Sequence, residues 1–380
     1  MNNKNVYMPG PSNVRENVRQ ARSIKTTNPD VDVDFVEFYK NTCDKMAKII
    51  NTKNDVYILS GEGILGLEAA CASLTEKDDR VLVIDNGVFG KGFEDFVTMY
   101  GGEAVLFSKC YKKAIDVEEL ERFLEKDHDF KYATIVHCDT PTGVLNDLSK
   151  ICPLLKKYNI LTVVDSVAAM VGEKLLVDDW QIDMVLGGSQ KAISAQPGLS
   201  IVSVSEDAKN TMKNRKSKII GFYCNLTIWE NYYEQKYFPY TMPISDIISL
   251  DRALENILEE GTENTIKRHE KVAKATREAL KEYGGELFLN SGYSNTVTAL
   301  VIPESIGALN LTKYIREKYN TIIGTSLGEY VDKLLRIGHM GENAKLDKII
   351  YILDILDNSL KDLGFKGNGS LVSLFNKYYK

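Results

Sequence analysis

The sequence predicts an α/β protein with a mostly parallel seven-stranded sheet between helices, followed by a smaller C-terminal α/β domain. From residue 55 onward, short apolar runs alternate with amphipathic stretches, which indicates that strands alternate with helices. The apolar runs are continuous, as in strands that helices cover on both faces. After residue 244 the pattern changes to one long helical segment, so we expect a second domain there.

The strand candidates of the larger domain are short runs rich in Val, Ile and Leu. They are residues 55–60, 80–85, 102–108, 132–139, 160–166, 183–189 and 198–205. Residues with helical spacing and polar outer faces lie between them, at 64–75, 89–100, 116–126 and 147–158. Ligands of such sheets bind at the carboxyl ends of the strands.

The second part begins with a helical segment at 244–284, which is interrupted near Gly261. Strand-like runs follow at 295–303, 321–330 and 333–341, and a last helix is expected at 344–364. The tail, residues 365–380, carries too little pattern for a prediction.

Composition and charge exclude several classes of protein. With 380 residues, 44% of them apolar and 26% charged, the chain is typical of a globular protein rather than a disordered or fibrous one. A net charge of −6, with basic and acidic residues interleaved, gives no basic surface for nucleic acid. No stretch approaches the roughly 18 apolar residues of a membrane span, and the N-terminal residues lack a signal-peptide core. We therefore expect a cytoplasmic protein with neither nucleic acid nor membrane as a partner.

The cysteines and histidines do not indicate a metal site. The six cysteines contain no C-x-x-C pair, and the four histidines are dispersed, so we expect neither a zinc site nor a disulfide framework.

A glycine-rich stretch, SGEGILGLEAA at residues 60–70, follows the first strand candidate and opens a helical pattern. Gly61, Gly63 and Gly66 match the G-x-G-x-x-G spacing, and Asp85 ends the next strand about 20 residues on, as in dinucleotide-binding domains. The free N–H groups at a helix N-terminus bind phosphate in general. The stretch by itself leaves three possibilities open: a dinucleotide, another phosphate, or a simple packing turn.

Three further strand ends carry polar or reactive residues, at 137–143, 163–170 and 187–198. An enzyme that uses pyridoxal phosphate needs a lysine for a Schiff base and a carboxylate beside the pyridine nitrogen. Lys191 and Asp165 are the candidates. Each also has a simpler interpretation, as a surface lysine and as the cap of a turn.

Taken together, these features make the chain resemble the class V, fold type I aminotransferases, and within them the alanine–glyoxylate and serine–pyruvate group. Eight motifs in order carry the resemblance: MPGPSN at 8–13, SGEGILGLEAA, VLVIDNGVFG at 81–90, HCDTPTGVL at 137–145, VDSVAA at 164–169, GGSQKA at 187–192, YTMP at 240–243 and LRIGHMG at 335–341. The resemblance implies the fold of pyridoxal phosphate enzymes of type I. It divides the chain into an N-terminal segment (1–20) that packs on the small domain or on a dimer partner, a large domain (21–255) and a small domain (256–380).

The resemblance also implies roles for the residues around the cofactor ring. Lys191 would form the Schiff base with pyridoxal 5'-phosphate and move the substrate proton, and Asp165 would pair with the pyridinium. Phe89 would stack on the ring, Thr140 would bind near its phenolic oxygen, and Arg336 would hold the substrate carboxylate.

The phosphate is expected in a cup at the glycine turn. The residues assigned to that cup are Gly61, Glu62, Gly63, Ile64 and Gln190. Thr241 would reach the phosphate from the neighbouring subunit, because the family forms homodimers with shared active sites.

Three positions depart from the family pattern. Glu62 stands where relatives place a phosphate-binding Ser or Thr, and a carboxylate repels phosphate unless it turns away, takes a proton or pairs with a cation. Phe238 stands where some relatives supply a tyrosine, for which Tyr237 or Tyr240 could substitute. Pro141 interrupts a hydroxyl-rich run.

The sequence therefore predicts transamination between a small amino acid, of the alanine or serine class, and glyoxylate or pyruvate. The nearest alternatives are a 2-aminoethylphosphonate transaminase and a cysteine desulfurase, although the latter needs a cysteine in the C-terminal third and the last one here is Cys224. An NAD-dependent dehydrogenase that uses the glycine motif, or a binding protein that has lost turnover, are the alternatives from other classes.

Overall fold

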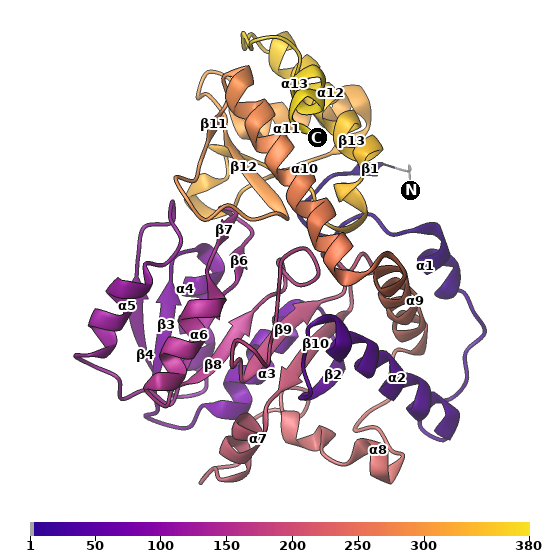
Figure 1. Ribbon diagram of the computed structural model, residues 1–380. Helices are drawn as coiled ribbons and strands as arrows, with labels where there is room; N and C mark the ends of the chain where they lie inside the picture. Colours follow the sequence, from indigo (N-terminus) through magenta and orange to yellow (C-terminus); the bar gives the residue numbers. More distant parts are fainter. Residues whose placement is uncertain (1–3) are drawn as a thin grey trace.

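A seven-stranded sheet forms the centre of the larger domain (Figure 1). The computed structural model describes residues 4–380. Across the sheet the strands follow the order β2 (Asp55–Ser60), β10 (Leu199–Val204), β9 (Met184–Gly188), β8 (Leu161–Asp165), β5 (Tyr132–Val136), β3 (Arg80–Asp85) and β4 (Glu103–Ser108). Only β10 runs antiparallel to its neighbours in this sheet. The sheet is mostly parallel, as the sequence predicted.

Helices cover the sheet because each presents an apolar face to it. They are α2 (Val33–Ile49), α3 (Gly63–Leu74), α4 (Val88–Met99), α5 (Val117–Leu124), α6 (Leu148–Lys157) and α7 (Glu206–Lys213). α3 packs on β9 and β10, α4 on β3 and β4, α6 on β8, and α2 on β2. Since β2, β3, β5, β8 and β9 run in one direction, their carboxyl ends meet at one edge of the sheet.

A four-stranded antiparallel sheet forms the core of the smaller C-terminal part, in the order β11 (Glu286–Leu287), β12 (Val297–Val301), β15 (Leu334–Gly338) and β14 (Gly324–Thr325). Its helices are α10 (Thr262–Tyr283), α11 (Ala308–Tyr319), α12 (Leu346–Asp362) and α13 (Leu371–Tyr378). α13 lies in the tail, residues 365–380, for which we made no prediction. Leu371 and Phe375 are fully buried, and α13 packs on α10 and α12.

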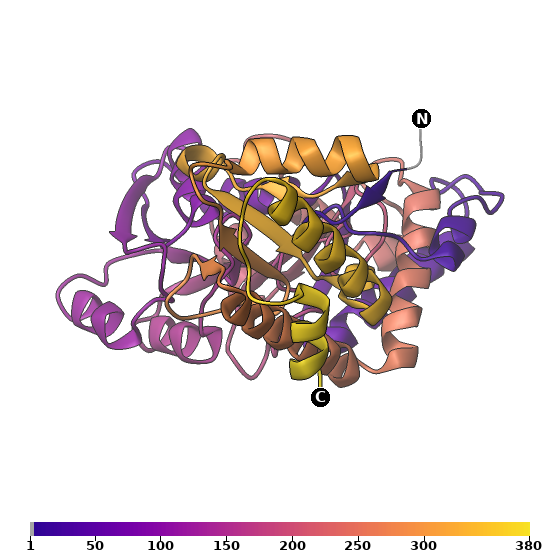
Figure 2. The same ribbon diagram turned by 90° about the horizontal axis from the view of Figure 1, so that it is seen from above.

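The helical segment at 244–284 is divided at Gly261, as expected, into α9 (Ile244–Glu260) and α10. Gly261 has a φ of 85°, a conformation that favours glycine. α9 packs on α1 (Glu16–Ala21) and α2, whereas α10 packs on α13. Viewed from above, α10, α11 and α12 lie around the smaller sheet (Figure 2). The predicted domain limits stay a prediction.

The N-terminal segment crosses from the smaller part to the larger one. β1 (Asn5–Val6) pairs in parallel with β13 (Thr321–Ile322), and the Ser12 N–H donates to the Gln190 carbonyl at 2.9 Å. Residues 1–3 of the predicted segment lie outside the described residues. The remaining elements are the strands β6 (Cys138–Asp139) and β7 (Val144–Leu145), α8 (Tyr232–Gln235), and 3₁₀ turns at Leu226–Trp229, Gly328–Tyr330 and Gly341–Ala344.

Two findings concern residues 4–380 as a set. No helix among them has the length and apolar character that a membrane crossing requires. No group of three or more His, Cys, Asp or Glu side chains in the same range is arranged to hold a metal ion.

Candidate active site

A cavity of about 250 Å³ opens at the carboxyl ends of the parallel strands. It is lined by Glu62, Gly63, Ile64, Leu67, Phe89, Cys138, Thr140, Asp165, Val167, Ala168, Gln190 and Lys191. Eight of the residues predicted from the sequence are in this set. Segments more than 120 residues apart in the chain therefore meet around one space, as expected for strand ends of a parallel sheet.

Lys191 lies in this cavity under the N-terminal segment. Its Nζ donates to the carbonyl of Pro9 at 2.9 Å. Gly10 packs directly on the lysine, because a Cβ placed there would lie 2.3 Å from Lys191 Cδ. Burial lowers the pKa of Lys191, and the positive charge of Arg336 lowers it further, while Asp165 opposes the change. A lysine with a lowered pKa is a better nucleophile and base near neutrality.

Asp165 ends β8 beneath the cavity. Its Oδ1 accepts the N–H of Val167 at 2.8 Å. Burial raises the pKa of Asp165 to about 7, and the Val167 N–H and the Lys191 charge offset part of that rise. A cation placed against this carboxylate, such as a protonated pyridine nitrogen, would favour its ionised form.

Phe89 stands at the start of α4 and is held there by Asp139. The Phe89 N–H donates to Asp139 Oδ1 at 2.8 Å, and Thr142 Oγ1 donates to Oδ2 at 3.0 Å. Gly87 leaves the space for this carboxylate, because a Cβ at that position would lie 2.3 Å from Asp139 Cγ. Burial raises the pKa of Asp139 to about 6. These bonds fix the backbone of Phe89, whose side chain lines the cavity.

Glu62 occupies the helix terminus where the sequence placed a phosphate. It is the N-cap of α3, and its Oε1 accepts the N–H of Ile64 at 3.1 Å. Gln190 Nε2 donates to Oε2 of the same carboxylate at 3.1 Å. In the described part of the chain, the buried Oε1 of Gln190 has no hydrogen-bond partner. This end of the cavity therefore presents oxygen acceptors, one of them already negatively charged.

Arg336 lies behind the wall of the cavity, on β15. Its Nε donates to the carbonyl of Thr325 at 2.7 Å, and its Nη1 donates to the carbonyl of Thr140 at 3.4 Å. Burial lowers the pKa of Arg336 to about 10, and the negative charge of Asp139 opposes this. Since these bonds go to backbone carbonyls, the guanidinium keeps its capacity to pair with a carboxylate that enters the cavity.

Two other predicted residues do not line the cavity. Gly61 forms the turn before α3, with its N–H donating to the carbonyl of Gly198 at 2.8 Å. Thr241 is exposed, and its hydroxyl donates to Asp30 at 3.0 Å. Asp85, the acidic residue of the dinucleotide alternative, is occupied by hydrogen bonds from Ser108 at 2.8 Å and Tyr111 at 2.7 Å.

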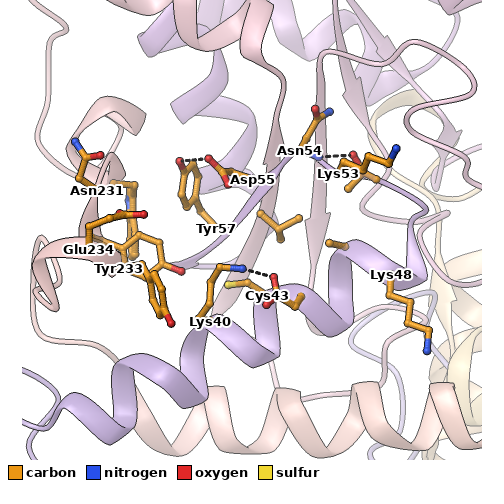
Figure 3. A pocket seen from close by; sticks show the side chains of 16 residues that line it. Lys40, Cys43, Lys48, Lys53, Asn54, Asp55, Tyr57, Asn231, Tyr233 and Glu234 are labelled. Carbon is orange, nitrogen blue, oxygen red and sulfur yellow. Dashed lines mark hydrogen bonds and ion pairs between the residues drawn. The ribbon is translucent and has the colours of Figure 1, made fainter.

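A larger cavity, of about 380 Å³, lies at the opposite edge of the sheet, near the start of β2 (Figure 3). Three of its six charged lining residues take part in ion pairs. Lys40 forms an ion pair with Asp44, and Asp55 forms one with Lys209. None of the predicted catalytic residues is in its lining. We therefore place the active site in the smaller cavity at the strand ends.

Comparison with known proteins identifies the family. The sequence model of class V aminotransferases matches residues 16–331. The chain belongs to the class V aminotransferases. An uncharacterised aminotransferase of Methanocaldococcus jannaschii is 34% identical to it, with 96% of this chain and 94% of that protein covered. The pyridoxamine–pyruvate transaminase of Mesorhizobium japonicum is 33% identical, with 94% and 91% covered.

The structure of ureidoglycine–glyoxylate aminotransferase from Bacillus subtilis superposes on this aminotransferase with a TM-score of 0.95 at 26% identity. The superposition covers 100% of this chain and 98% of that one. This superposition confirms the type I fold predicted from the sequence. The family and the relatives confirm two further predictions: aminotransferase activity between small amino acids and 2-oxo acids, and membership of a class whose members use pyridoxal phosphate.

The residues present fit one end of that cofactor better than the other. The ring end is served by Lys191, by the buried Asp165 and by Phe89 at the cavity wall. At the phosphate end, the Glu62 carboxylate already accepts the helix N–H that a phosphate would use. A phosphate could take this place only if Glu62 moved away or its charge were neutralised.

Sequence reasoning missed two groups that the structure places at the site. Pro9 was part of a recognised motif, but nothing in a motif shows that its carbonyl would meet Lys191. Asp139 directly precedes Thr140, and an acidic residue at a strand end was a signal that could have been used. The packing of Gly87 against it needed the structure.

Proposed function

We propose that Lys191, Asp165, Phe89 and Arg336 carry out the aminotransfer reaction of this protein. The observation that supports this most is the convergence of Lys191, Asp165 and Phe89 on one cavity, with the Arg336 guanidinium held just behind Thr140. Such a set can bind a planar ring, a carboxylate and a proton in transit at the same time.

Each residue has a separate task in this proposal. When it is bound, the pyridine ring supplies a conjugated system that withdraws electrons from the substrate. Lys191 holds and moves the proton at its Nζ, for which its lowered pKa suits it. Asp165 keeps a positive charge on the ring nitrogen, Phe89 fixes the plane of the ring, and Arg336 orients the substrate through its carboxylate.

A panel of amino donors with pyruvate and with glyoxylate tests this function. We expect turnover with small donors such as alanine or serine, and at least a 100-fold loss in Lys191→Ala, the range typical of a lost acid–base residue. A Lys174→Ala variant serves as a control because Lys174 is an exposed lysine of the same domain. Equal activity of Lys191→Ala and the wild type would refute the assignment.

A second candidate function is favoured by Glu62. Its carboxylate and the unpartnered Oε1 of Gln190 are acceptors, so they suit a hydroxyl donor better than a phosphate. Unphosphorylated pyridoxamine carries a hydroxymethyl group at that position. Charge supports the same choice, because Glu62 and Asp165 face the cavity with Lys191 as the one cation in its lining. A relative in Mesorhizobium japonicum is named a pyridoxamine–pyruvate transaminase.

In this second candidate, free pyridoxamine is the amino donor and pyruvate the acceptor. The two functions are separated by supplying pyridoxamine with pyruvate, without an amino acid and without phosphorylated cofactor, and measuring alanine. Alanine formed at a rate that exceeds the rate with pyridoxamine phosphate supports the second function. No alanine from pyridoxamine, together with turnover of amino acids, supports the first function alone.

The proposed assembly is a homodimer with Thr241 reaching the partner's cavity. It is supported by large exposed apolar side chains near Thr241 in the chain, namely Ile220, Phe222, Tyr223 and Tyr237. Sedimentation at equilibrium tests it, and a monomer at micromolar concentration would refute it. The cytoplasmic location expected from the sequence stays a prediction.

A further inference from the structure

A buried carboxylate that the reaction does not use joins the two parts of the chain. Glu173 is 4% exposed. Its Oε1 accepts the hydroxyl of Ser294 at 2.9 Å and the backbone N–H of Asn295, and its Oε2 accepts Nδ2 of Asn295 at 2.9 Å. Ser294 and Asn295 lie just before Thr296 and β12 of the smaller sheet. One side chain of the larger domain thus satisfies three donors of the smaller one.

On its own side, Glu173 belongs to the loop that starts at Asp165. The Glu173 N–H donates to the Ala169 carbonyl at 2.8 Å, so the loop is closed on itself. The loop also fits closely against the smaller domain. A Cβ placed at Gly172 would lie 2.3 Å from Thr296 Cγ2. This contact is one of several between the two parts of the chain, since the Ser326 hydroxyl also donates to the Pro141 carbonyl at 2.7 Å.

On the other side, the contact continues toward Arg336. The carbonyl of Asn295 accepts Nδ1–H of His339 at 2.9 Å, and Thr298 donates to Nε2 of that ring at 2.8 Å. This tautomer follows from the hydrogen-bond partners. His339 directly follows β15, on which Arg336 lies opposite Ala299 of β12. The segment held by Glu173 thus leads into β12, which pairs with the strand that carries the arginine.

We propose that Glu173 is a positioning residue whose contacts with Ser294 and Asn295 set the place of Arg336 relative to Asp165 and Lys191. The inference rests on the proposed role of Arg336 in binding the substrate carboxylate. Asp165 belongs to the larger domain and Arg336 to the smaller one, so their separation fixes where the reacting carbon lies over the ring. A displacement of about 1 Å at such a site can reduce the rate by about 100-fold.

Several titratable groups surround this contact. Arg277 of α10 donates to the Ser294 carbonyl at 2.6 Å, and Cys138, His269 and His339 lie nearby. Burial raises the pKa of Glu173 to about 7, while the bonds from Asn295 and Ser294 and the charge of Arg277 oppose the rise. Burial lowers the pKa of His339 to about 3 and that of His269 to about 4, so both stay neutral near pH 7.

The sign of the pH effect follows from these groups. Below pH 7, protonated Glu173 has an oxygen that carries a hydrogen, so it accepts fewer of its three donors. We therefore expect the KM for pyruvate to decrease as the pH rises through about 7. Asp165 titrates in the same range. The part of the pH dependence of KM that is due to Glu173 is therefore the part that disappears in Glu173→Gln.

The experiment compares Glu173→Gln, Glu173→Ala and Asn295→Ala with the wild type. Glu304→Gln is the control, because Glu304 is an exposed glutamate of the smaller part. We expect the KM for pyruvate to rise about tenfold in Glu173→Ala, with a smaller change in kcat and with pyridoxal binding within about twofold. Asn295→Ala removes only the Nδ2 donor, so the KM for pyruvate should rise less than in Glu173→Ala, and the double variant should add little to the effect of Glu173→Ala. In Glu173→Gln the pH dependence of KM should flatten.

The outcomes separate this inference from the function on which it rests. An unchanged KM in Glu173→Ala, or a loss of pyridoxal binding equal to the rise in KM, would overturn the positioning role. A wild-type protein that does not turn over any 2-oxo acid would instead refute the proposed function. In that case amide hydrogen exchange still tests whether Glu173 holds this segment. Glu173→Ala should speed exchange at Asn295 and along β15 but not in β8.

Discussion

Replacing Glu62 by glutamine tests the most unusual feature of the site. The substitution removes one negative charge and keeps the shape of the side chain. The glutamine oxygen can still accept the Ile64 N–H at the start of α3, a bond of 3.1 Å in the structure. Any change in ligand preference therefore reports the charge rather than the cap.

The size of the effect follows from Coulomb's law. Glu62 is exposed, so the dielectric around it is close to that of water, in which two unit charges 4 Å apart interact by about 1 kcal/mol. A phosphate monoester carries a charge of about −1.5 to −2 near neutral pH. The carboxylate should therefore weaken phosphate binding by about 2 kcal/mol, which is about 30-fold in Kd.

The assay measures Kd for pyridoxal phosphate and for pyridoxal by equilibrium dialysis, at low salt and at high salt. In Glu62→Gln, the Kd for the phosphate form divided by the Kd for pyridoxal should fall about 30-fold, and less at high salt, which screens exposed charges. Glu68→Gln is a matched control, because Glu68 is on the same helix and accepts the Tyr100 hydroxyl outside the cavity. A ratio that changes by less than about twofold would refute the electrostatic account.

Three further predictions concern other parts of the site. Arg336→Lys should raise the KM for carboxylate substrates about tenfold or more, with little effect on pyridoxal binding, because an ammonium group cannot form the bidentate contact; unchanged kinetics would place the carboxylate elsewhere. Burial raises the pKa of Asp165 from 3.8 to about 7. Its contribution to the free energy of unfolding is therefore fully present below about pH 4 and is lost as the pH rises to about 7. In urea unfolding of the protein without cofactor, the free energy of unfolding should therefore fall over this pH range, by about a few kcal/mol at most. The fall should be absent in Asp165→Asn, and parallel curves for the two proteins would contradict the prediction. Gly10→Ala should destabilise the protein by about 1–3 kcal/mol and displace Lys191, because Gly10 has a φ of 92° and the added Cβ meets the lysine. Gly92→Ala is the control, because the space around its Cβ is open, and this variant should unfold at the wild-type temperature or above.

Much of the site was visible in the sequence because of where parallel strands end. Lys191 and Asp165 each follow a buried apolar run, and the helix that opens at Gly63 follows another. In a parallel sheet these ends lie at one edge, so residues far apart in the sequence could be placed together before the structure was known. The order of strands and helices followed in the same way from local patterns.

Other features could not be predicted, because they depend on contacts between distant segments. The sequence predicts one strand over residues 132–139, but the main-sheet strand ends at Val136, and Cys138–Asp139 pair with β7 in a separate two-stranded sheet. α13 is a short helix of eight residues, and its apolar side chains are buried because α10 and α12 cover them. Local periodicity does not encode either event.

The sequence by itself determined the class of fold, the elements and the chemical identity of the residues at the strand ends. Hydrophobic periodicity and turn residues act over a few positions, so they can be recognised in the sequence alone. Only the tertiary structure decided that the Glu62 carboxylate occupies the helix terminus, that Pro9 meets Lys191, and that Glu173 joins the two domains. The bond from Gln190 that holds the Glu62 carboxylate, the Pro9 contact and the Glu173 contact each join segments more than 100 residues apart, where small differences in backbone position decide which polar groups can reach each other.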